Sequence, residues 1–224
     1  MRIIITILFV QIFAISSYSQ QYSEHYNERK ALFETTVDTE NEIIFLGNSI
    51  TEGGDWKVLF PNQNVINRGI SGDTTDGVLF RLDEITSSKP KKIFILIGTN
   101  DLARGKSIDY VLNNSKILLE KIKADSKETK IYLQSVLPYN PNVGDKFSSH
   151  KSKQQDVLVL NKKLKKLARK QEAKFLNIHK NFRNKKGELK ADLTYDGLHL
   201  NKNGYIFWAK IIKTIQNAER SGRR

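Results

Sequence analysis

A serine in the first half of the chain and an aspartate–histidine pair near its end have the residue types that acyl transfer needs. Ser49 lies in a Gly-Asn-Ser-Ile-Thr segment, directly after an apolar run. Asp196 precedes His199 by three residues, with a glycine between them. A carboxylate on one ring nitrogen orients an imidazole, and the other nitrogen is then free to take a hydroxyl proton. The three residues therefore have the side chains of a serine nucleophile and its base.

Each piece also has a purely structural interpretation. Ser49 followed by Glu52 resembles a capping box, in which both side chains satisfy amides at the start of a helix. The segment is not the GxSxG elbow of α/β-hydrolases, because Thr51 replaces the second glycine. Asp196 and Gly197 can form a turn that leaves His199 on the surface. Catalysis therefore requires that these distant segments meet in space.

Two further segments contain donors for a negatively charged oxygen. The stretch 67–73 holds two glycines, and Gly72 can point its backbone amide into a cleft that a side chain would block. Asn100, in the stretch 98–101, adds a neutral amide donor. Alternatively, Asp73 or Thr74 caps the next helix and Asn100 only forms a turn.

The elements that position these residues follow from hydrophobic periodicity. Short apolar or β-branched runs alternate with longer segments of helical period, a pattern typical of βαβ units. The predicted strands are 43–46, 65–67, 93–97, 131–135 and 175–178, and the predicted helices are 55–60, 75–85, 108–126, 154–172 and 202–216. We expect an α/β fold, a three-layer α/β/α sandwich with a five-stranded parallel sheet and the site at the carboxyl ends of the strands. The irregular stretch from Pro138 to about Ser149 follows the fourth strand and is a candidate substrate-facing loop.

Taken together, these segments resemble the blocks of the SGNH hydrolase superfamily, also called GDSL esterases and lipases, over residues 42–215. The resemblance implies the flavodoxin-like SGNH hydrolase fold and a serine esterase that needs no metal or cofactor. It implies a triad of Ser49, His199 and Asp196, and an oxyanion hole made by Ser49, Gly72 and Asn100. One departure is Asn48, which stands where the family usually has aspartate. Because the family's triad acid is the later aspartate, this change bears on fine tuning more than on activity.

The segments around Ser49 and His199 are most similar to the exported acetylhydrolase and glycan O-acetylesterase branch of this superfamily. The resemblance therefore implies short acyl groups, above all acetyl, on a carbohydrate. A lysophospholipase or thioesterase of the same fold is the alternative. Trp56, which could stack on a sugar or pack in the core, Arg68 and Tyr139 are candidate substrate contacts.

Composition excludes several other classes of site and locates the charge. The 224 residues include no cysteine, which excludes disulfides, cysteine-ligated metals and a cysteine nucleophile. The net charge is +13, and residues 146–190 contain 15 Lys or Arg against 3 Asp or Glu. The lysine-rich helix 154–172 is either an amphipathic helix with a solvated face or a surface that attracts an anionic polysaccharide or envelope lipid; we expect no nucleic-acid partner. A non-catalytic anion- or glycan-binding module on the same fold is the rival hypothesis.

The amino-terminal segment predicts export. Arg2, an apolar run at 3–15 and small residues at 17 and 19 are typical of a secretory signal peptide, and the apolar run is too short to span a bilayer. We therefore divide the chain into a signal peptide at 1–19, a leader at 20–41, the SGNH domain at 42–218 and a basic tail at 219–224. The mature chain is expected to be periplasmic or secreted, with no transmembrane segment.

Overall fold

The computed structural model describes residues 22–222. The predicted signal peptide lies outside the described residues, as do the first two residues of the leader and the last two of the tail. Within residues 22–222, none of the helices has both the length and the hydropathy that crossing a membrane requires.

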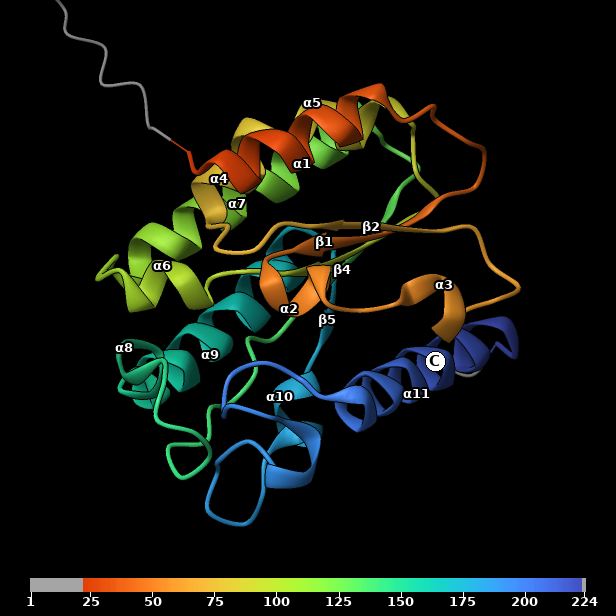
Figure 1. The fold of residues 1–224 in the computed structure, drawn as a ribbon. Helices are drawn as coiled ribbons and strands as arrows, with labels where there is room; N and C mark the ends of the chain where they lie inside the picture. Colours follow the sequence, from red (N-terminus) through yellow and green to blue (C-terminus); the bar gives the residue numbers. More distant parts are fainter. Residues whose placement is uncertain (1–21, 223–224) are drawn as a thin grey trace, which may run out of the picture.

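A five-stranded sheet forms the centre of the protein (Figure 1). All neighbouring strands pair in parallel, in the order β2-β1-β3-β4-β5, which confirms the predicted α/β class. The middle strands are almost wholly buried, as expected for a sheet covered on both faces. The strand bounds are Ile43–Gly47 (β1), Val65–Gly69 (β2), Lys92–Leu96 (β3), Lys130–Gln134 (β4) and Lys174–Leu176 (β5).

Helices cover both faces of the sheet, so the predicted three layers are present. Their bounds are Glu24–Thr35 (α1), Ser49–Glu52 (α2), Trp56–Leu59 (α3), Thr75–Phe80 (α4), Leu82–Ser87 (α5), Thr99–Ala103 (α6), Ile108–Asp125 (α7), Ser148–Lys151 (α8), Gln154–Lys170 (α9), Ile178–Phe182 (α10) and Lys202–Arg220 (α11). Figure 1 shows α1, α4, α5 and α7 above the sheet and α3 and α11 below it. Helices α3, α7, α9 and α11 confirm predicted helices.

The short helices α2, α6, α8 and α10 were not predicted, and two longer features also differ from the prediction. The leader forms α1, whose Tyr26 and Phe33 pack with Ile70 in a small separate apolar cluster. The predicted helix 75–85 is divided into α4 and α5 at Arg81. The buried guanidinium of Arg81 pairs with Asp73 at 2.9 Å and donates to two strand-end carbonyls, so these contacts determine the local backbone.

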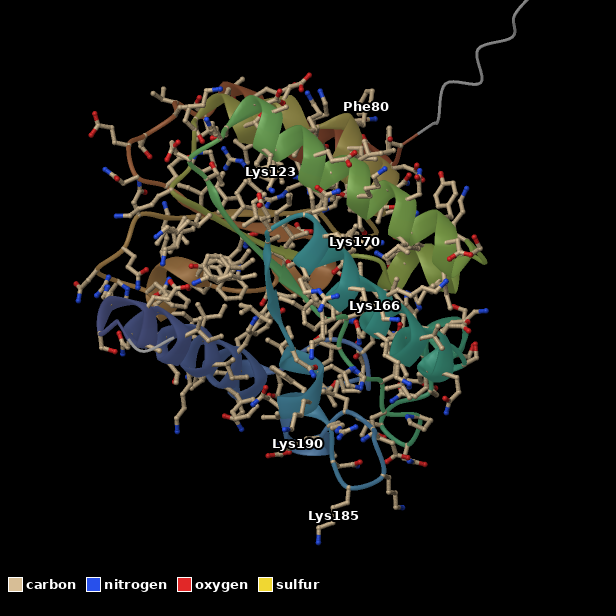
Figure 2. The ribbon with its side chains drawn as sticks, turned by 180° about the vertical axis from the view of Figure 1, so that it is seen from behind. Phe80, Lys123, Lys166, Lys170, Lys185 and Lys190 are labelled. Carbon is tan, nitrogen blue, oxygen red and sulfur yellow. The ribbon has the colours of Figure 1, made fainter. Side chains whose placement is uncertain are left out.

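Helix α9 is amphipathic, as its sequence predicts. Its buried side includes Val157, Leu160, Leu164 and Leu167. Lysines cover its other side, and Figure 2 shows Lys166 and Lys170 projecting from it. The packing role of this helix is thus established, and the binding role of its lysines is taken up below.

The last helix, α11, extends along the sheet and is attached at its far end. It begins just after Asn201, whose side chain accepts from Gly204 N and so caps it. Near its carboxyl end, Glu219 accepts from the Tyr132 hydroxyl and pairs with Lys92 and Lys174, the first residues of β3 and β5. The helix ends at Arg220, two residues past the domain end at 218 that the sequence predicts.

Candidate active site

The chain around Ser49 is shaped by the tight approach of β1 to its neighbour. A side chain at Gly47 would collide with the carbonyl of Leu96 on β3, so glycine is needed where β1 ends. Asn48 caps α2 by accepting from Ile50 N at 3.0 Å. Ser49 is then the first residue of the helix and has its hydroxyl free for other contacts.

This arrangement excludes the capping-box interpretation. Asn48, and not Ser49, satisfies the helix start. Glu52 instead accepts from the amide and hydroxyl of Ser71 and contacts His25. Asn48 is buried and uses its carboxamide oxygen as the cap acceptor, so it does the capping work without placing a charge in the core.

The histidine and aspartate meet Ser49 across 150 residues of sequence. The Ser49 Oγ lies 3.0 Å from Nε2 of His199, and Nδ1 of the same ring lies 2.7 Å from Oδ2 of Asp196. Gly197 between them has a positive φ of 84°, and a side chain there would collide with the carbonyl of Asn140. The glycine thus permits the turn that places carboxylate and imidazole side by side.

The environment of Asp196 keeps its carboxylate charged. Burial raises its pKa, but the hydrogen bond with the His199 ring and those donated by the His199 and Leu198 amides outweigh burial, and the pKa falls below its usual value. Both amides donate to Oδ1 and leave Oδ2 for the imidazole. The carboxylate is therefore held in place as an acceptor for Nδ1–H.

Gly72 and Asn100 lie in the same cavity as Ser49 and His199. This cavity has a volume of about 430 Å³ and is formed at the carboxyl ends of the strands, as predicted. Gly72 has a φ of 79°. Within residues 22–222, neither the Ser49 amide nor the Gly72 amide donates a hydrogen bond to the backbone or to a side chain. These two amides and the Asn100 side chain are thus positioned as a set of donors.

Three substrate contacts predicted from the sequence are not in this cavity. Trp56 is buried, with its ring stacked on Phe45 at a centroid distance of 3.8 Å, so of the two alternatives it packs in the core and is not a substrate contact. Arg68 is also buried and pairs with Glu84. Tyr139 lies behind the cavity wall, where its hydroxyl bonds to Thr99. All three fill or brace the core, a role that residue type alone does not distinguish from sugar binding.

The predicted substrate-facing loop does reach the cavity. The stretch after β4 supplies Phe147, Ser149 and His150 to its wall. Arg104 at the end of α6 also lines it and donates to the Gly72 carbonyl at 2.7 Å. His150 was not predicted as a site residue. It is one of only four histidines and follows the irregular stretch directly, and this position could have indicated a role in the site.

The chain is similar to several known proteins over most of its length. The profile of the GDSL-like lipase/acylhydrolase family matches residues 45–206. Human platelet-activating factor acetylhydrolase IB subunit alpha2 is 31% identical over 185 residues, which cover 80% of this chain and 76% of that protein. A GDSL-like lipase from Bacteroides thetaiotaomicron is 27% identical with a TM-score of 0.73 and covers 88% of this chain and 98% of its own. An acetyl xylan esterase, 20% identical with a TM-score of 0.65 over 78% of this chain and 98% of its own, shares the fold.

The matched region contains all of the cavity residues that the sequence predicted, from Ser49 to His199. The chain belongs to the GDSL-like lipase/acylhydrolase family and is a serine ester hydrolase.

Proposed function

We propose that this protein is an exported esterase that removes short acyl groups, chiefly acetyl, from carbohydrates by means of a Ser49-His199-Asp196 triad. The observation that carries the proposal is the continuous hydrogen-bonded chain from the Ser49 hydroxyl through the His199 ring to the Asp196 carboxylate. It is supported by the presence of Gly72 and Asn100 in the cavity that Ser49 and His199 line. A lysophospholipase or thioesterase would use the same triad on a different ester.

In the proposed mechanism His199 Nε2 takes the Ser49 proton while Oγ attacks the ester carbonyl. The carbonyl oxygen becomes an oxyanion and accepts hydrogen bonds from the Ser49 and Gly72 amides and the Asn100 carboxamide. Collapse of the tetrahedral intermediate breaks the bond to the alcohol oxygen, which takes the proton from His199. Water then attacks the acyl-enzyme with His199 as base, and release of the acid restores Ser49.

The shape of the cavity and the relatives support a short acyl group. Phe147, Leu198 and Ala103 are apolar residues of its wall, and about 430 Å³ is near the small end of ligand pockets. One relative is by name an acetylhydrolase, and one structural neighbour is an acetyl xylan esterase. Among p-nitrophenyl esters from acetate to palmitate, we expect kcat/KM for acetate to exceed that for palmitate by at least about tenfold. Acetate release from acetylated xylan should follow, and a preference for palmitate would favour the lysophospholipase alternative.

Export is proposed from the amino-terminal sequence alone. The positive residue, short apolar run and small residues of positions 2–19 support it. Fractionation of the native host, with amino-terminal sequencing of the recovered protein, should give a mature chain that begins at Gln20 outside the cytoplasm. A cytoplasmic chain that retains residues 1–19 would contradict this part of the proposal.

Replacing Asn100 by alanine should lower kcat by about 10²- to 10³-fold and change KM little, because an oxyanion donor acts mainly in the transition state. The measurement is steady-state hydrolysis of p-nitrophenyl acetate. Asn113→Ala, the same substitution at an exposed position of α7, is the matched control and should keep native kcat. A kcat for Asn100→Ala within threefold of native would remove Asn100 from the oxyanion hole.

We also propose that the lysine-rich face binds an anionic polysaccharide. Lys116, Lys163, Lys166 and Lys170 line a groove of about 590 Å³ between α7 and α9. Lys163 pairs with Asp109 and Lys116 with Glu120, whereas Lys166 and Lys170 have no carboxylate within ion-pair distance among residues 22–222. Figure 2 shows the latter two on the same side of the molecule. The ammonium groups of Lys166 and Lys170 can therefore pair with the anionic groups of a bound polysaccharide.

Heparin affinity at several NaCl concentrations tests this binding. We expect Lys166→Glu/Lys170→Glu to reduce the slope of log affinity against log salt by about one to two. Lys185→Glu/Lys186→Glu makes the same change in net charge at exposed positions outside the groove and should keep more of the native slope. Equal losses from the two double variants would show that net charge alone causes retention.

A further inference from the structure

We propose that His150 is a positioning residue that holds the Asn100 carboxamide with its NH2 group turned toward the reacting oxygen. The proposal rests on the oxyanion role proposed above for Asn100. His150 lies on α8, and its side chain forms part of the cavity wall between Phe147 and Asn100. The family resemblance assigns roles to five residues of the site, and His150 is not among them.

Two hydrogen bonds fix the orientation of the Asn100 amide. Its Nδ2 donates to the Asp73 carbonyl at 2.8 Å, and its Oδ1 lies 2.9 Å from His150 Nε2. Rotation of the amide by half a turn would place Oδ1 against the Asp73 carbonyl, an acceptor facing an acceptor. With Oδ1 held by His150, one N–H of Nδ2 goes to Asp73 and the second is left for the substrate.

This role requires a particular tautomer of His150. Because the carboxamide oxygen only accepts, His150 must carry a proton on Nε2 to donate to it. Its Nδ1 is buried and has no hydrogen-bond partner within residues 22–222, which suits an unprotonated nitrogen. Burial lowers the pKa of His150, and the nearby His199 and Arg104 lower it further. The ring is therefore neutral around pH 7, with its one proton directed at Asn100.

Packing keeps the His150 ring in this orientation. Phe147 lies edge-on to His150, with ring centroids 5.7 Å apart, and edge-on to His199 at 5.0 Å. Tyr139 also packs edge-on to His150 and bonds through its hydroxyl to Thr99, the residue before Asn100. Phe147 itself has a φ of 62°, a left-handed conformation that costs free energy in a residue other than glycine. The loop after β4 thus braces both the base and the holder of the oxyanion donor.

Three variants separate the hydrogen bond from the packing. His150→Phe keeps an aromatic ring and removes the donor, and His150→Asn keeps a donor that is too short to reach Asn100. Both should lower kcat for p-nitrophenyl acetate about tenfold with KM within about twofold, because the Asn100 carboxamide stays in the site but is no longer held in its orientation. His150→Gln, whose Nε2 reaches about as far as the imidazole Nε2, should recover kcat to within about threefold of native.

A double-mutant cycle tests whether His150 acts through Asn100. On an Asn100→Ala background, His150→Phe should cause no further loss of kcat, since the group it positions is gone. The same tenfold loss on both backgrounds would overturn the proposal and indicate a direct contact with substrate. A His150→Phe enzyme with native kcat would overturn it as well.

Two controls keep the result interpretable. Thermal unfolding followed by circular dichroism shows whether each variant is folded. If the His150→Phe variant does not fold, the comparison of His150→Gln with His150→Asn decides. Asn100→Ala alone tests the proposed oxyanion role. Loss of activity in Asn100→Ala without loss in His150→Phe contradicts only the inference about His150, whereas native activity in Asn100→Ala contradicts the function proposed for Asn100.

Discussion

Replacing Ser49 by alanine is expected to lower kcat for p-nitrophenyl acetate by about 10⁵- to 10⁶-fold, while substrate binding is kept. The hydroxyl is the only group that the proposed mechanism acylates, and it is the one held 3.0 Å from His199 Nε2. The oxyanion donors remain in the variant, so a residual rate of about 10³- to 10⁴-fold over water is expected from them and from binding. Two measurements compare the variant with the native enzyme: the steady-state rate of ester hydrolysis and covalent labelling by a fluorophosphonate.

The matched control for this experiment is Ser152→Ala, an exposed serine just past α8. It should be labelled by the fluorophosphonate and turn over the ester like the native enzyme, whereas Ser49→Ala should not be labelled. Hydrolysis by Ser49→Ala within tenfold of the native rate would show that another group is the nucleophile.

Replacing Asp196 by asparagine is expected to lower kcat by about 10⁴-fold, although the two side chains have the same shape. The Oδ1 of Asp196 accepts the Leu198 and His199 amides, so an asparagine keeps its oxygen there and turns its NH2 toward the imidazole. Nδ1 must then accept, and the ring proton moves to Nε2. An imidazole protonated at Nε2 cannot take the Ser49 proton.

Steady-state rates of p-nitrophenyl acetate hydrolysis by the native enzyme and the variant, measured side by side at pH 8, check this expectation. Asp192→Asn is the control, an exposed aspartate on the same loop, and should retain native kcat. A loss of less than tenfold in Asp196→Asn would mean that Asp196 does not set the ring's tautomer.

The sheet and the donors at its edge were predictable because they depend on local patterns. Each strand is an apolar run bounded by polar or turn residues, and parallel strands bring their carboxyl ends to one edge. Ser49, Gly72 and Asn100 follow three such strands, so their convergence follows from topology. Helix α1 was not predicted, because its sequence is mostly polar and its few apolar residues find their partners only in the folded chain.

The direction of individual side chains was the part that the sequence did not reveal. Trp56 and Arg68 are residue types that bind sugars, and here both are buried by neighbours from other elements. His150 shows the opposite case, because its contact with Asn100 spans 50 residues and depends on the path of an irregular loop. Such contacts are set by tertiary packing, which periodicity does not report.

The attachment of α11 gives the last few residues of the chain a structural role that terminal residues usually lack. His199 lies just ahead of this helix, and Glu219 fastens the opposite end to Tyr132, Lys92 and Lys174. The helix thus connects the segment that holds His199, the proposed base, to the first residues of β3 and β5. A carboxy-terminal truncation that removed Glu219 would free this end of the helix from β3 and β5. The orientation of the His199 ring would then depend on a residue that lies far from the ester.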